Sequence, residues 1–198
     1  MTNDVTDQSL RLRGLVLAGG RSRRFGSDKA AIEIDGQSLL DRTAGLMQAL
    51  VDRVYVSVAE NQVDDPLRSR YPMVRDEEPG LGPAGGLRAA HRLHPEAAWL
   101  VVACDLPGLD ERTVADLVQS RNAEKAATAY RSPVDGHPEP LCAIYEPATL
   151  ARFASQTAAG RGLSPRTLLC DSDTELLESP EPGTLRNVNT PADLQCDG

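Results

Sequence analysis

The sequence predicts an α/β protein built on a single doubly wound, mostly parallel sheet. Short apolar runs alternate along the chain with segments whose apolar residues recur at helical spacing, the pattern of strands joined by crossover helices. The most apolar run, 99–104, resembles a strand buried on both faces in the middle of such a sheet. The chain has 198 residues, 40% of them hydrophobic, enough for one core. We expect one domain over 11–198, preceded by a flexible polar tail at 1–10.

Each expected element follows from its local pattern. Apolar residues recur at helical spacing between 38 and 50, Pro83 suits the first turn of a helix, and Asp110 is a good N-cap for another. The expected strands are 12–18, 53–58, 73–75, 99–104, 125–130 and 140–145. The expected helices are 38–50, 83–93, one that begins after Asp110, 147–159, and a short one from Thr190.

The charge balance and the cysteines argue against several classes of function. The formal net charge of −8 lacks the excess of Lys and Arg that a general nucleic-acid or membrane surface needs. No apolar stretch approaches the ~20 residues of a membrane span, and the first residues lack the regions of a signal peptide. The four cysteines form no CxxC pair, and the three histidines show no zinc-binding spacing. We expect a cytoplasmic protein with reduced thiols and no nucleic-acid or membrane partner.

A loop rich in glycine and arginine follows the first expected strand. Gly19 and Gly20 let the backbone approach a ligand and offer amide N–H groups to phosphate oxygens. Four nearby cations can neutralise a triphosphate, namely Arg21, Arg23, Arg24 and Lys29. A bare glycine pair is more often an ordinary turn, but this density of cations in an acidic chain favours a phosphate site. The loop is not a P-loop, because Gly-x-x-x-x-Gly-Lys-Ser/Thr is absent.

Two aspartates follow other expected strands. Asp76 comes after 73–75 and Asp105 after 99–104, and ligands of an open parallel sheet gather beyond such carboxyl ends. Mg²⁺ is typically held by one or two carboxylates plus substrate phosphates, so Asp105 is a candidate magnesium ligand. Taken alone, an aspartate that forms a turn before a proline explains Asp105 equally well.

The glycines after Asp76 offer a competing interpretation. Gly80, Gly82 and Gly85 match the dinucleotide fingerprint Gly-x-Gly-x-x-Gly, with Asp105 at about the distance of a ribose-binding acid. The fingerprint should follow its strand directly, but carboxylate-bearing residues intervene and would repel a pyrophosphate in the absence of a metal. NAD binding therefore stays a minor alternative, because a lone fingerprint is weak evidence.

The C-terminal half holds two further candidates. Asn187 and Asn189 lie on one side of an extended segment, where two amides can read the edge of a heterocycle. A polar turn before a helix is the simpler explanation if nothing else is known. His137 lies in an expected turn, where a substrate contact and a plain loop histidine are equally good explanations.

The N-terminal loop resembles the signature of a known family. The run Leu17-Ala18-Gly19-Gly20-Arg21-Ser22-Arg23-Arg24-Phe25-Gly26-Ser27-Asp28-Lys29 is similar to LAGGxSxRMGxDK of the molybdenum cofactor guanylyltransferases, which are MobA-like nucleotidyltransferases. The resemblance continues through Gly82-Pro83-Ala84-Gly85-Gly86, Cys104-Asp105-Leu106-Pro107, His137-Pro138 and Asn187-Val188-Asn189-Thr190-Pro191. Phe25 replaces the usual Met, and Ser57 stands where the family often has an asparagine.

The resemblance implies a Rossmann-like, GT-A-like nucleotidyltransferase fold and a reaction. GMP would pass from GTP to the terminal phosphate of molybdopterin carrying molybdenum, with Mg²⁺ required and pyrophosphate released. The attack on the α-phosphorus of GTP would be in line, assisted by positioning and charge neutralisation. The implied catalytic residues are Lys29, Asp105 and Arg23, with Asp105 as the metal ligand. The implied binding residues are Leu17, Ala18, Gly19, Gly20, Arg21, Lys29, Ser57, Asp76, Gly82, Asp105, Asn187 and Asn189.

Two alternatives stay open at this point. A cytidylyltransferase of the same fold would act on molybdopterin or another phosphorylated acceptor, but the resemblance associates it with LAAG, whereas Gly19-Gly20 leaves room for a purine. A non-catalytic nucleotide-binding relative is the other alternative, and the presence of Lys29 and Asp105 argues against it. The resemblance also suggests other molybdenum-cofactor biosynthesis proteins and molybdoenzyme chaperones as candidate partners.

Overall fold

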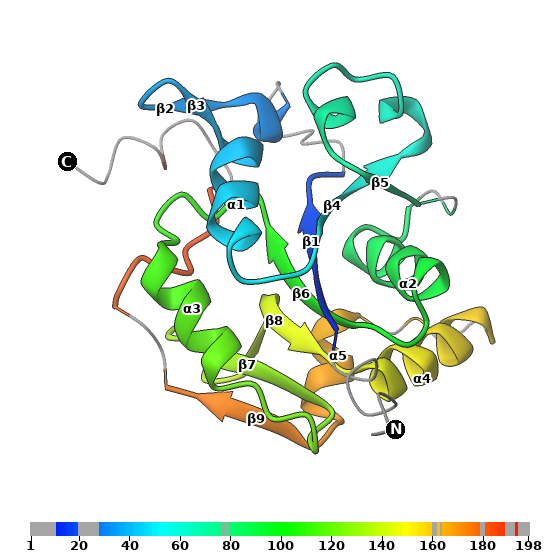
Figure 1. Ribbon diagram of the computed structural model, residues 1–198. Helices are drawn as coiled ribbons and strands as arrows, with labels where there is room; N and C mark the ends of the chain where they lie inside the picture. The colour runs from blue at the N-terminus through cyan, green and yellow to red at the C-terminus, as the bar shows by residue number, and fades with distance from the viewer. Residues whose placement is uncertain are drawn as a thin grey trace, which may run out of the picture.

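The computed structural model describes residues 11–19, 28–76, 78, 80–159, 162, 164–178, 181–188 and 193. A seven-stranded sheet with strand order β5-β4-β1-β6-β8-β7-β9 forms its centre (Figure 1). The strands of this sheet are β1 (Leu12–Leu17), β4 (Val54–Ala59), β5 (Met73–Asp76), β6 (Ala98–Ala103), β7 (Ala127–Arg131), β8 (Pro138–Tyr145) and β9 (Thr174–Leu177). The helices are α1 (Leu39–Gln48), α2 (Pro83–Leu93), α3 (Glu111–Gln119), α4 (Pro147–Ala158) and α5 (Pro165–Cys170). The remaining elements are a small hairpin of β2 (Glu33–Ile34) and β3 (Gln37–Ser38) and three 3-10 turns. These turns are η2 (Lys29–Ala31), η3 (Glu60–Gln62) and η4 (Arg68–Arg70).

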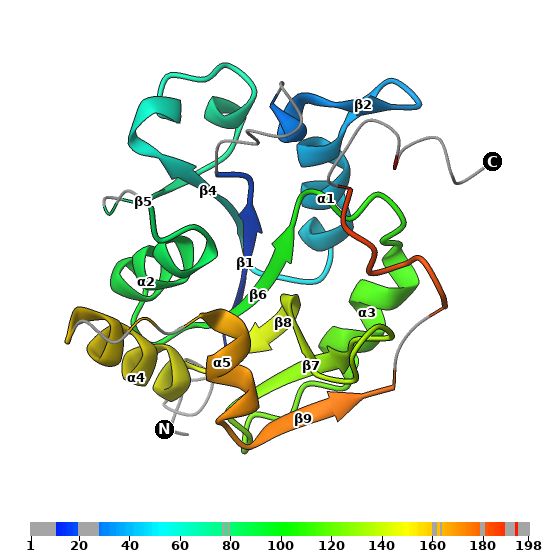
Figure 2. The same cartoon turned by 180° about the vertical axis from the view of Figure 1, so that it is seen from behind.

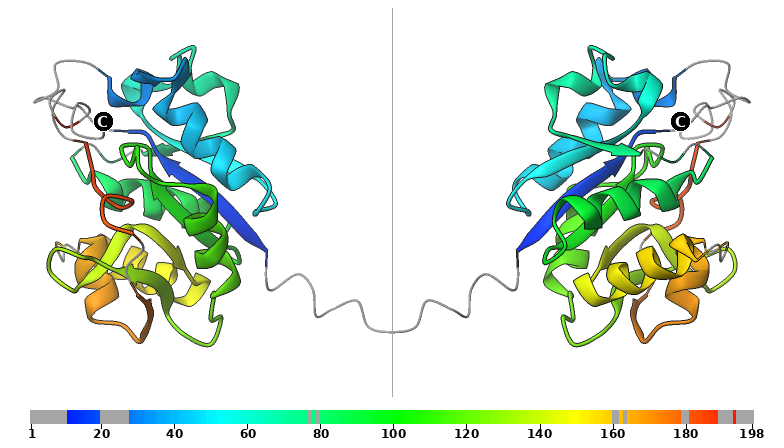
Figure 3. Two further views of the ribbon diagram at one scale, coloured as in Figure 1. Left: turned by 90° about the vertical axis from the view of Figure 1, so that its left-hand side faces the viewer. Right: turned by 90° about the vertical axis from the view of Figure 1, so that its right-hand side faces the viewer.

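Helices cover both faces of the sheet (Figure 2), and the side views of Figure 3 show the strands between them. On one face, α1 and α3 pack through residues such as Met47 and Leu117. On the other face, α2, α4 and α5 pack through residues such as Leu87, Phe153 and Leu168. The predicted doubly wound α/β architecture is therefore confirmed, because the two apolar clusters lie on opposite sides of one sheet.

Strand β6 occupies the middle of the sheet, as its apolar run predicts. All six of its residues are buried, and it lies between β1 and β8 as the fourth of seven strands. Successive side chains of a strand point to opposite faces. Leu100 and Val102 accordingly join the cluster under α1 and α3, and Trp99 and Val101 join the other.

The sheet is mixed rather than wholly parallel. Strands β5, β4, β1 and β6 run parallel, but β8 is antiparallel to both β6 and β7, and β9 is parallel to β7. Strands β7 and β8 are consecutive in the chain and form a hairpin, which the short connection between them permits without a crossover helix. β8 is thus the single reversed strand of the sheet.

The β2–β3 hairpin, helix α5, strand β9 and the three 3-10 turns were not among the expected elements. The β2–β3 hairpin turns at Asp35 and Gly36, which have φ of 53° and 77°, and this Asp-Gly pair is the available signal of a type I′ turn. Helix α5 is only six residues long, too short for helical periodicity to show. Strand β9 is half-buried throughout at the edge of the sheet and carries a charged residue, so no apolar run marks it. The tail at 1–10 and the short helix expected from Thr190 lie outside the described residues.

The carboxyl ends of the four parallel strands meet at one edge of the sheet. Leu17 at the end of β1 pairs with Ala103 at the end of β6, and the amide of Cys104 donates to the carbonyl oxygen of Leu17 over 3.3 Å. This edge therefore presents the residues after β1, Asp76 at the end of β5, and Asp105 beyond β6. No helix in the described part of the chain is long and apolar enough to cross a membrane.

Candidate active site

Two side chains that are far from Asp105 in the sequence converge on its carboxylate. Its Oδ2 atom accepts a hydrogen bond from Lys29 Nζ at 2.9 Å, and its Oδ1 atom accepts one from Asn187 Nδ2 at 2.9 Å. The Asp105 carbonyl oxygen also accepts from the Val188 amide at 2.9 Å. The Lys29 and Asp105 side chains are 15% and 19% exposed, which leaves the pair reachable from solvent but partly desolvated. Charge-assisted bonds of this kind are short and strong, so Asp105 has a defined orientation.

A pocket of about 170 Å³ lies beside this pair, at the carboxyl edge of the sheet. It is lined by Leu17, Ala18, Gly19, Asp28, Lys29, Ala30, Pro83, Ala103, Cys104, Asp105 and Leu141. Five residues that the sequence analysis selected are in this lining: Leu17, Ala18, Gly19, Lys29 and Asp105. Gly20, Arg21, Arg23 and Asn189, also selected from the sequence, lie outside the described residues.

Gly19 lies close to the backbone of β4. A Cβ at this position would be 3.4 Å from the carbonyl oxygen of Ser57 and 3.6 Å from the amide nitrogen of Ala59. The Ser57 side chain is 4% exposed and points under α2, where a Cβ on Gly86 would lie 2.6 Å from its Oγ atom. The structure therefore places the Ser57 hydroxyl beneath the helix and outside the pocket lining.

Asp76 lies under the first turn of α2. A Cβ added to Gly85 would lie 2.1 Å from Asp76 Oδ2, so no larger residue fits there without a shift of the carboxylate. Gly82 is the N-cap of the helix with φ of 55°, a conformation that L side chains rarely adopt. Burial raises the pKa of Asp76, and the Glu78 amide donates to its Oδ1 atom at 3.0 Å.

This packing gives the glycines after β5 a structural explanation. The space beside Gly85 is filled by the Asp76 carboxylate, so a glycine is needed here for close packing of α2 against the end of β5. The glycines let α2 approach β5 and the end of β1, and a Cβ on Gly86 would meet Leu17 at 2.8 Å.

A buried carboxyl that the sequence analysis missed lies on β8. Glu139 is 8% exposed, and burial raises its pKa. Arg166 Nη2 lies 4.0 Å from Glu139 Oε2, and Arg166 Nη1 lies 2.5 Å from Asp135 Oδ2. His137 lies in the same turn with its Nδ1 atom 3.8 Å from Cys170 Sγ. The available signal was a charged residue inside an apolar strand, at Pro138-Glu139-Pro140.

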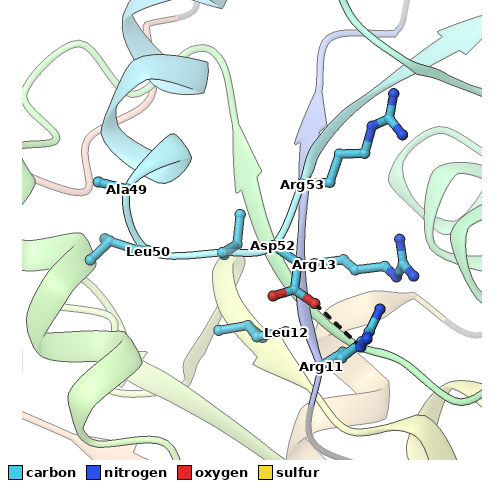
Figure 4. Close-up of a pocket in the computed structure, with 8 residues that line it drawn as sticks. Arg11, Leu12, Arg13, Ala49, Leu50, Asp52 and Arg53 are labelled. Carbon is cyan, nitrogen blue, oxygen red and sulfur yellow. Dashed lines mark ion pairs between the residues drawn. The ribbon is translucent and has the colours of Figure 1, made fainter. Parts of the chain in front are cut away.

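A larger hollow than the one beside Asp105 lies at the opposite edge of the sheet. Its volume is about 930 Å³, and Arg11, Arg13, Asp52 and Arg53 are among its lining residues (Figure 4). Arg11 Nε lies 3.9 Å from Asp52 Oδ2, a weak ion pair at a solvated surface. None of the residues selected from the sequence lines this hollow, so size does not mark the active site here.

Asp105 could bind Mg²⁺ only together with oxygen ligands that come from substrate phosphates and water. No group of three or more His, Cys, Asp or Glu side chains that could hold a metal ion occurs among the described residues, so these residues alone form no all-protein cage. Mg²⁺ does not require such a cage when substrate phosphates and water supply the other oxygens. The half-buried Asp105 carboxylate beside the pocket suits that mode of binding.

Comparisons with known proteins identify the family of this chain. A model of the MobA-like NTP transferase domain matches residues 14–173. The chain is 38% identical to a probable molybdenum cofactor guanylyltransferase of Mycobacterium ulcerans, over 92% of this chain and 91% of that protein. It is 31% identical to a molybdenum cofactor biosynthesis bifunctional protein of Synechocystis, over 92% of this chain, and it spans about half (52%) of that longer protein.

A solved structure supports the same fold. The crystal structure of molybdopterin-guanine dinucleotide biosynthesis protein A from Archaeoglobus fulgidus superposes with a TM-score of 0.74, at 22% identity, over 92% of this chain and 95% of that one. At this identity the likeness shows the fold alone. The matched domain and the curated relatives show that the chain is a nucleotidyltransferase that belongs to the MobA-like NTP transferase family.

Proposed function

We propose that this chain transfers GMP from GTP to the terminal phosphate of molybdopterin carrying molybdenum and releases pyrophosphate. The observation that carries the proposal is the Lys29–Asp105 pair at 2.9 Å beside Gly19, at the carboxyl edge of a nucleotidyltransferase sheet. Support for guanine and for the pterin acceptor comes from the named relatives, which are described as molybdenum cofactor guanylyltransferases.

The reaction is a displacement at phosphorus without a covalent enzyme intermediate. An oxygen of the acceptor phosphate attacks the α-phosphorus of GTP, and the bond from that phosphorus to the oxygen bridging the β-phosphate breaks. The electron pair of that bond leaves with pyrophosphate. The protein's part is to align the reactants and to offset the negative charge on the phosphates, the two effects that dominate this class of reaction.

Lys29 and Asp105 have complementary parts in this scheme. Each neutralises the other at 2.9 Å, which keeps both charged side chains satisfied in a partly desolvated site. A triphosphate offers Lys29 a second and stronger anionic partner. Asp105 would then hold Mg²⁺, which supplies charge neutralisation on the phosphate oxygens. Asn187, bonded to Asp105 Oδ1, keeps the carboxylate oriented.

The other selected residues receive proposed roles from their positions. Leu17, Ala18 and Gly19 line the pocket and would contact GTP, with guanine against this backbone. Gly20, Arg21 and Arg23 would contact phosphates. Asp76 and Gly82 would shape the nucleotide side where α2 begins, and Ser57 would act through the packing of that helix. Asn187 and Asn189 would face the pterin.

A nucleotide panel tests the proposal. The Tm of the protein should rise most with GTP in the presence of Mg²⁺, because a ligand that binds only the folded state stabilises it by mass action. Equal shifts with GTP, CTP and ATP would remove the guanine assignment, and a preference for CTP would favour the cytidylyltransferase alternative. Incubation with GTP, Mg²⁺ and molybdopterin should then yield pyrophosphate and the guanine dinucleotide. Nucleotide binding without pyrophosphate release would leave the non-catalytic alternative.

A further inference from the structure

Arg68 is a charged residue that the scheme above does not use. It begins η4, and its side chain is 1% exposed, which makes it one of the largest fully buried side chains of the described molecule. Burying a guanidinium costs several kcal/mol unless it is paired and hydrogen-bonded. Its neighbours must therefore supply a full set of acceptors.

All five N–H donors of Arg68 find an acceptor. Nε and Nη2 both donate to the carbonyl oxygen of Ala18, at 3.2 and 2.7 Å. Nη1 and Nη2 donate to the two carboxylate oxygens of Asp28, at 2.6 and 2.8 Å. Nη1 also donates to Asp65 Oδ1 at 3.1 Å. A guanidinium presents five donors in a rigid fork, so this set fixes the relative positions of three separate segments.

Two of those segments lead directly to the proposed site. Ala18 follows β1 and precedes Gly19, and both line the pocket. Asp28 precedes Lys29 and accepts from the Ala30 amide at 3.1 Å, which caps η2, the turn that begins with Lys29. The ionised state of Asp28 is secured by Arg68, because their hydrogen bond lowers the pKa of the Asp28 carboxyl. One side chain thus holds the stretch before Gly19 and the stretch before Lys29.

A purely stabilising role explains this arrangement poorly. Buried ion pairs are weak evidence for stability, since well-packed apolar residues in their place are often as stable or more so. Arg68 is packed in a region where apolar side chains such as Leu67 and Val63 already contribute to the core. What an apolar residue cannot reproduce is the fixed distance between the Ala18 carbonyl and the Asp28 carboxylate.

We infer that Arg68 is a positioning residue for nucleotidyl transfer. It fixes the end of β1 and the start of η2 relative to each other and thereby holds Lys29 opposite Asp105. The inference deepens the proposed function and rests on it. A displacement of the catalytic groups by about 1 Å can lower the rate about a hundredfold, so loss of the hydrogen bonds of Arg68 should lower kcat.

The molecule contains a matched control for this inference. Arg121 makes a second buried bidentate pair, with Nε 2.7 Å from Glu146 Oε1 and Nη2 2.8 Å from Glu146 Oε2. The two side chains are 12% and 9% exposed. Glu146 follows Tyr145, which pairs with Trp99 near the start of β6, so this pair lies at the edge of the sheet away from Asp105. It has the same chemistry as the Arg68–Asp28 pair and no contact with the pocket.

The experiment compares Arg68→Lys with Arg121→Lys. Lysine keeps the positive charge but cannot make the bidentate hydrogen bonds of a guanidinium, so both variants should lose thermal stability. Arg68→Lys should lower kcat for GMP transfer about tenfold to a hundredfold, with a smaller change in the KM for GTP. Arg121→Lys should keep kcat within about twofold of wild type. Equal kcat for the two variants would overturn the inference.

A second, milder pair of variants covers the outcome in which Arg68→Lys does not fold. Asp28→Asn and Asp65→Asn each remove one anionic partner of Arg68, but only Asp28 adjoins Lys29. Asp28→Asn should reduce kcat and Asp65→Asn should not. Equal losses in kcat would mean that Arg68 acts through stability alone.

Amide hydrogen exchange separates this inference from the proposed function. Exchange should accelerate in Arg68→Lys at the Ala30 and Ala31 amides, which donate to Asp28, and at the Cys104 amide, which donates to the Leu17 carbonyl oxygen at the end of β1. Exchange at the same amides should stay at the wild-type rate in Arg121→Lys. If wild-type protein transfers no GMP from GTP, the proposed function fails, and the exchange rates alone decide whether Arg68 fixes these two segments. Unchanged exchange in Arg68→Lys contradicts the inference whatever the activity.

Discussion

The two edges of the parallel half of the sheet use charged and polar side chains differently. At the carboxyl edge, Lys29 and Asn187 each donate a hydrogen bond of 2.9 Å to Asp105, and these side chains stay partly exposed beside a pocket. At the amino edge, Tyr55 packs edge-on against Trp99 with ring centroids 5.4 Å apart, and its hydroxyl lies 2.9 Å from His94 Nε2.

The difference lies in what a ligand could replace. Lys29 and Asp105 are each other's partners beside a pocket that solvent can reach. The phosphates of a ligand can therefore replace Asp105 as the partner of Lys29, and a cation can replace Lys29 as the partner of Asp105. The aromatic groups of the amino edge are bound to the core itself, and Trp99 is fully buried. Substitutions at the carboxyl edge should therefore affect activity more than stability, and those at the amino edge the reverse.

The largest expected effect is on activity, at Asp105. Asp105→Asn keeps the size of the side chain but removes the charge that would hold Mg²⁺ and that neutralises Lys29. We expect GMP transfer to fall about a thousandfold, in the range seen when one electrostatic group of an active site is lost. Thermal unfolding should show that the variant is folded. Near-normal turnover in a steady-state assay would show that the metal role is wrong.

At the amino edge, Trp99→Ala should give the largest loss of stability. Replacing a fully buried aromatic side chain by alanine typically costs about 3–5 kcal/mol, because apolar contacts are lost and a cavity remains. The free energy of unfolding in urea measures this loss. The folded fraction should keep wild-type kcat at low temperature, and a large drop in kcat would contradict the separation between the two edges.

A glycine at the carboxyl edge tests packing beneath the site. Gly85→Ala places a Cβ 2.1 Å from Asp76 Oδ2, so the carboxylate or α2 must move. We expect a loss of about 1–3 kcal/mol in unfolding free energy, the usual cost of overpacking. Gly45→Ala in α1 is the matched control, since nothing lies within 4 Å of its Cβ, and alanine there should be neutral or stabilising by up to about 1 kcal/mol. Equal effects of the two changes would mean that α2 adapts freely.

The smallest expected effect is the change of folding stability with pH, which has opposite signs at Asp76 and Asp110. Burial raises the pKa of Asp76, so the folded state binds the proton more tightly, and the contribution of Asp76 to stability falls as pH rises above about 4. Hydrogen bonds from Thr113 lower the pKa of Asp110, so its contribution is lost as pH falls below about 4. Asp76→Asn should therefore raise the Tm at pH 7 more than at pH 4. Asp110→Asn should lower the Tm at pH 7 and change it less at pH 3, and thermal scans across pH measure both.

The sequence predicted the framework of this molecule because local patterns determine it. The apolar run at 99–104 identified the central strand, and Asp110 caps α3 by accepting from the Thr113 amide at 2.7 Å, as its residue type suggests. The reversal of β8 was not predictable from its apolar pattern. Periodicity identifies a buried strand but carries no information about its direction.

The candidate site divides in the same way. Lys29, Asp105 and Asn187 could each be selected from the sequence as a cation, a carboxylate or an amide after an expected element. Their convergence over 2.9 Å, and the fork of Arg68 on Ala18 and Asp28, were decided only by the tertiary structure. Sequence alone could not rank Arg68 above other arginines, because a guanidinium acquires its function from the acceptors that surround it. Those acceptors, Asp28 and Ala18, lie 40 and 50 residues away from Arg68 along the chain, and only the folded sheet brings them into contact with its guanidinium.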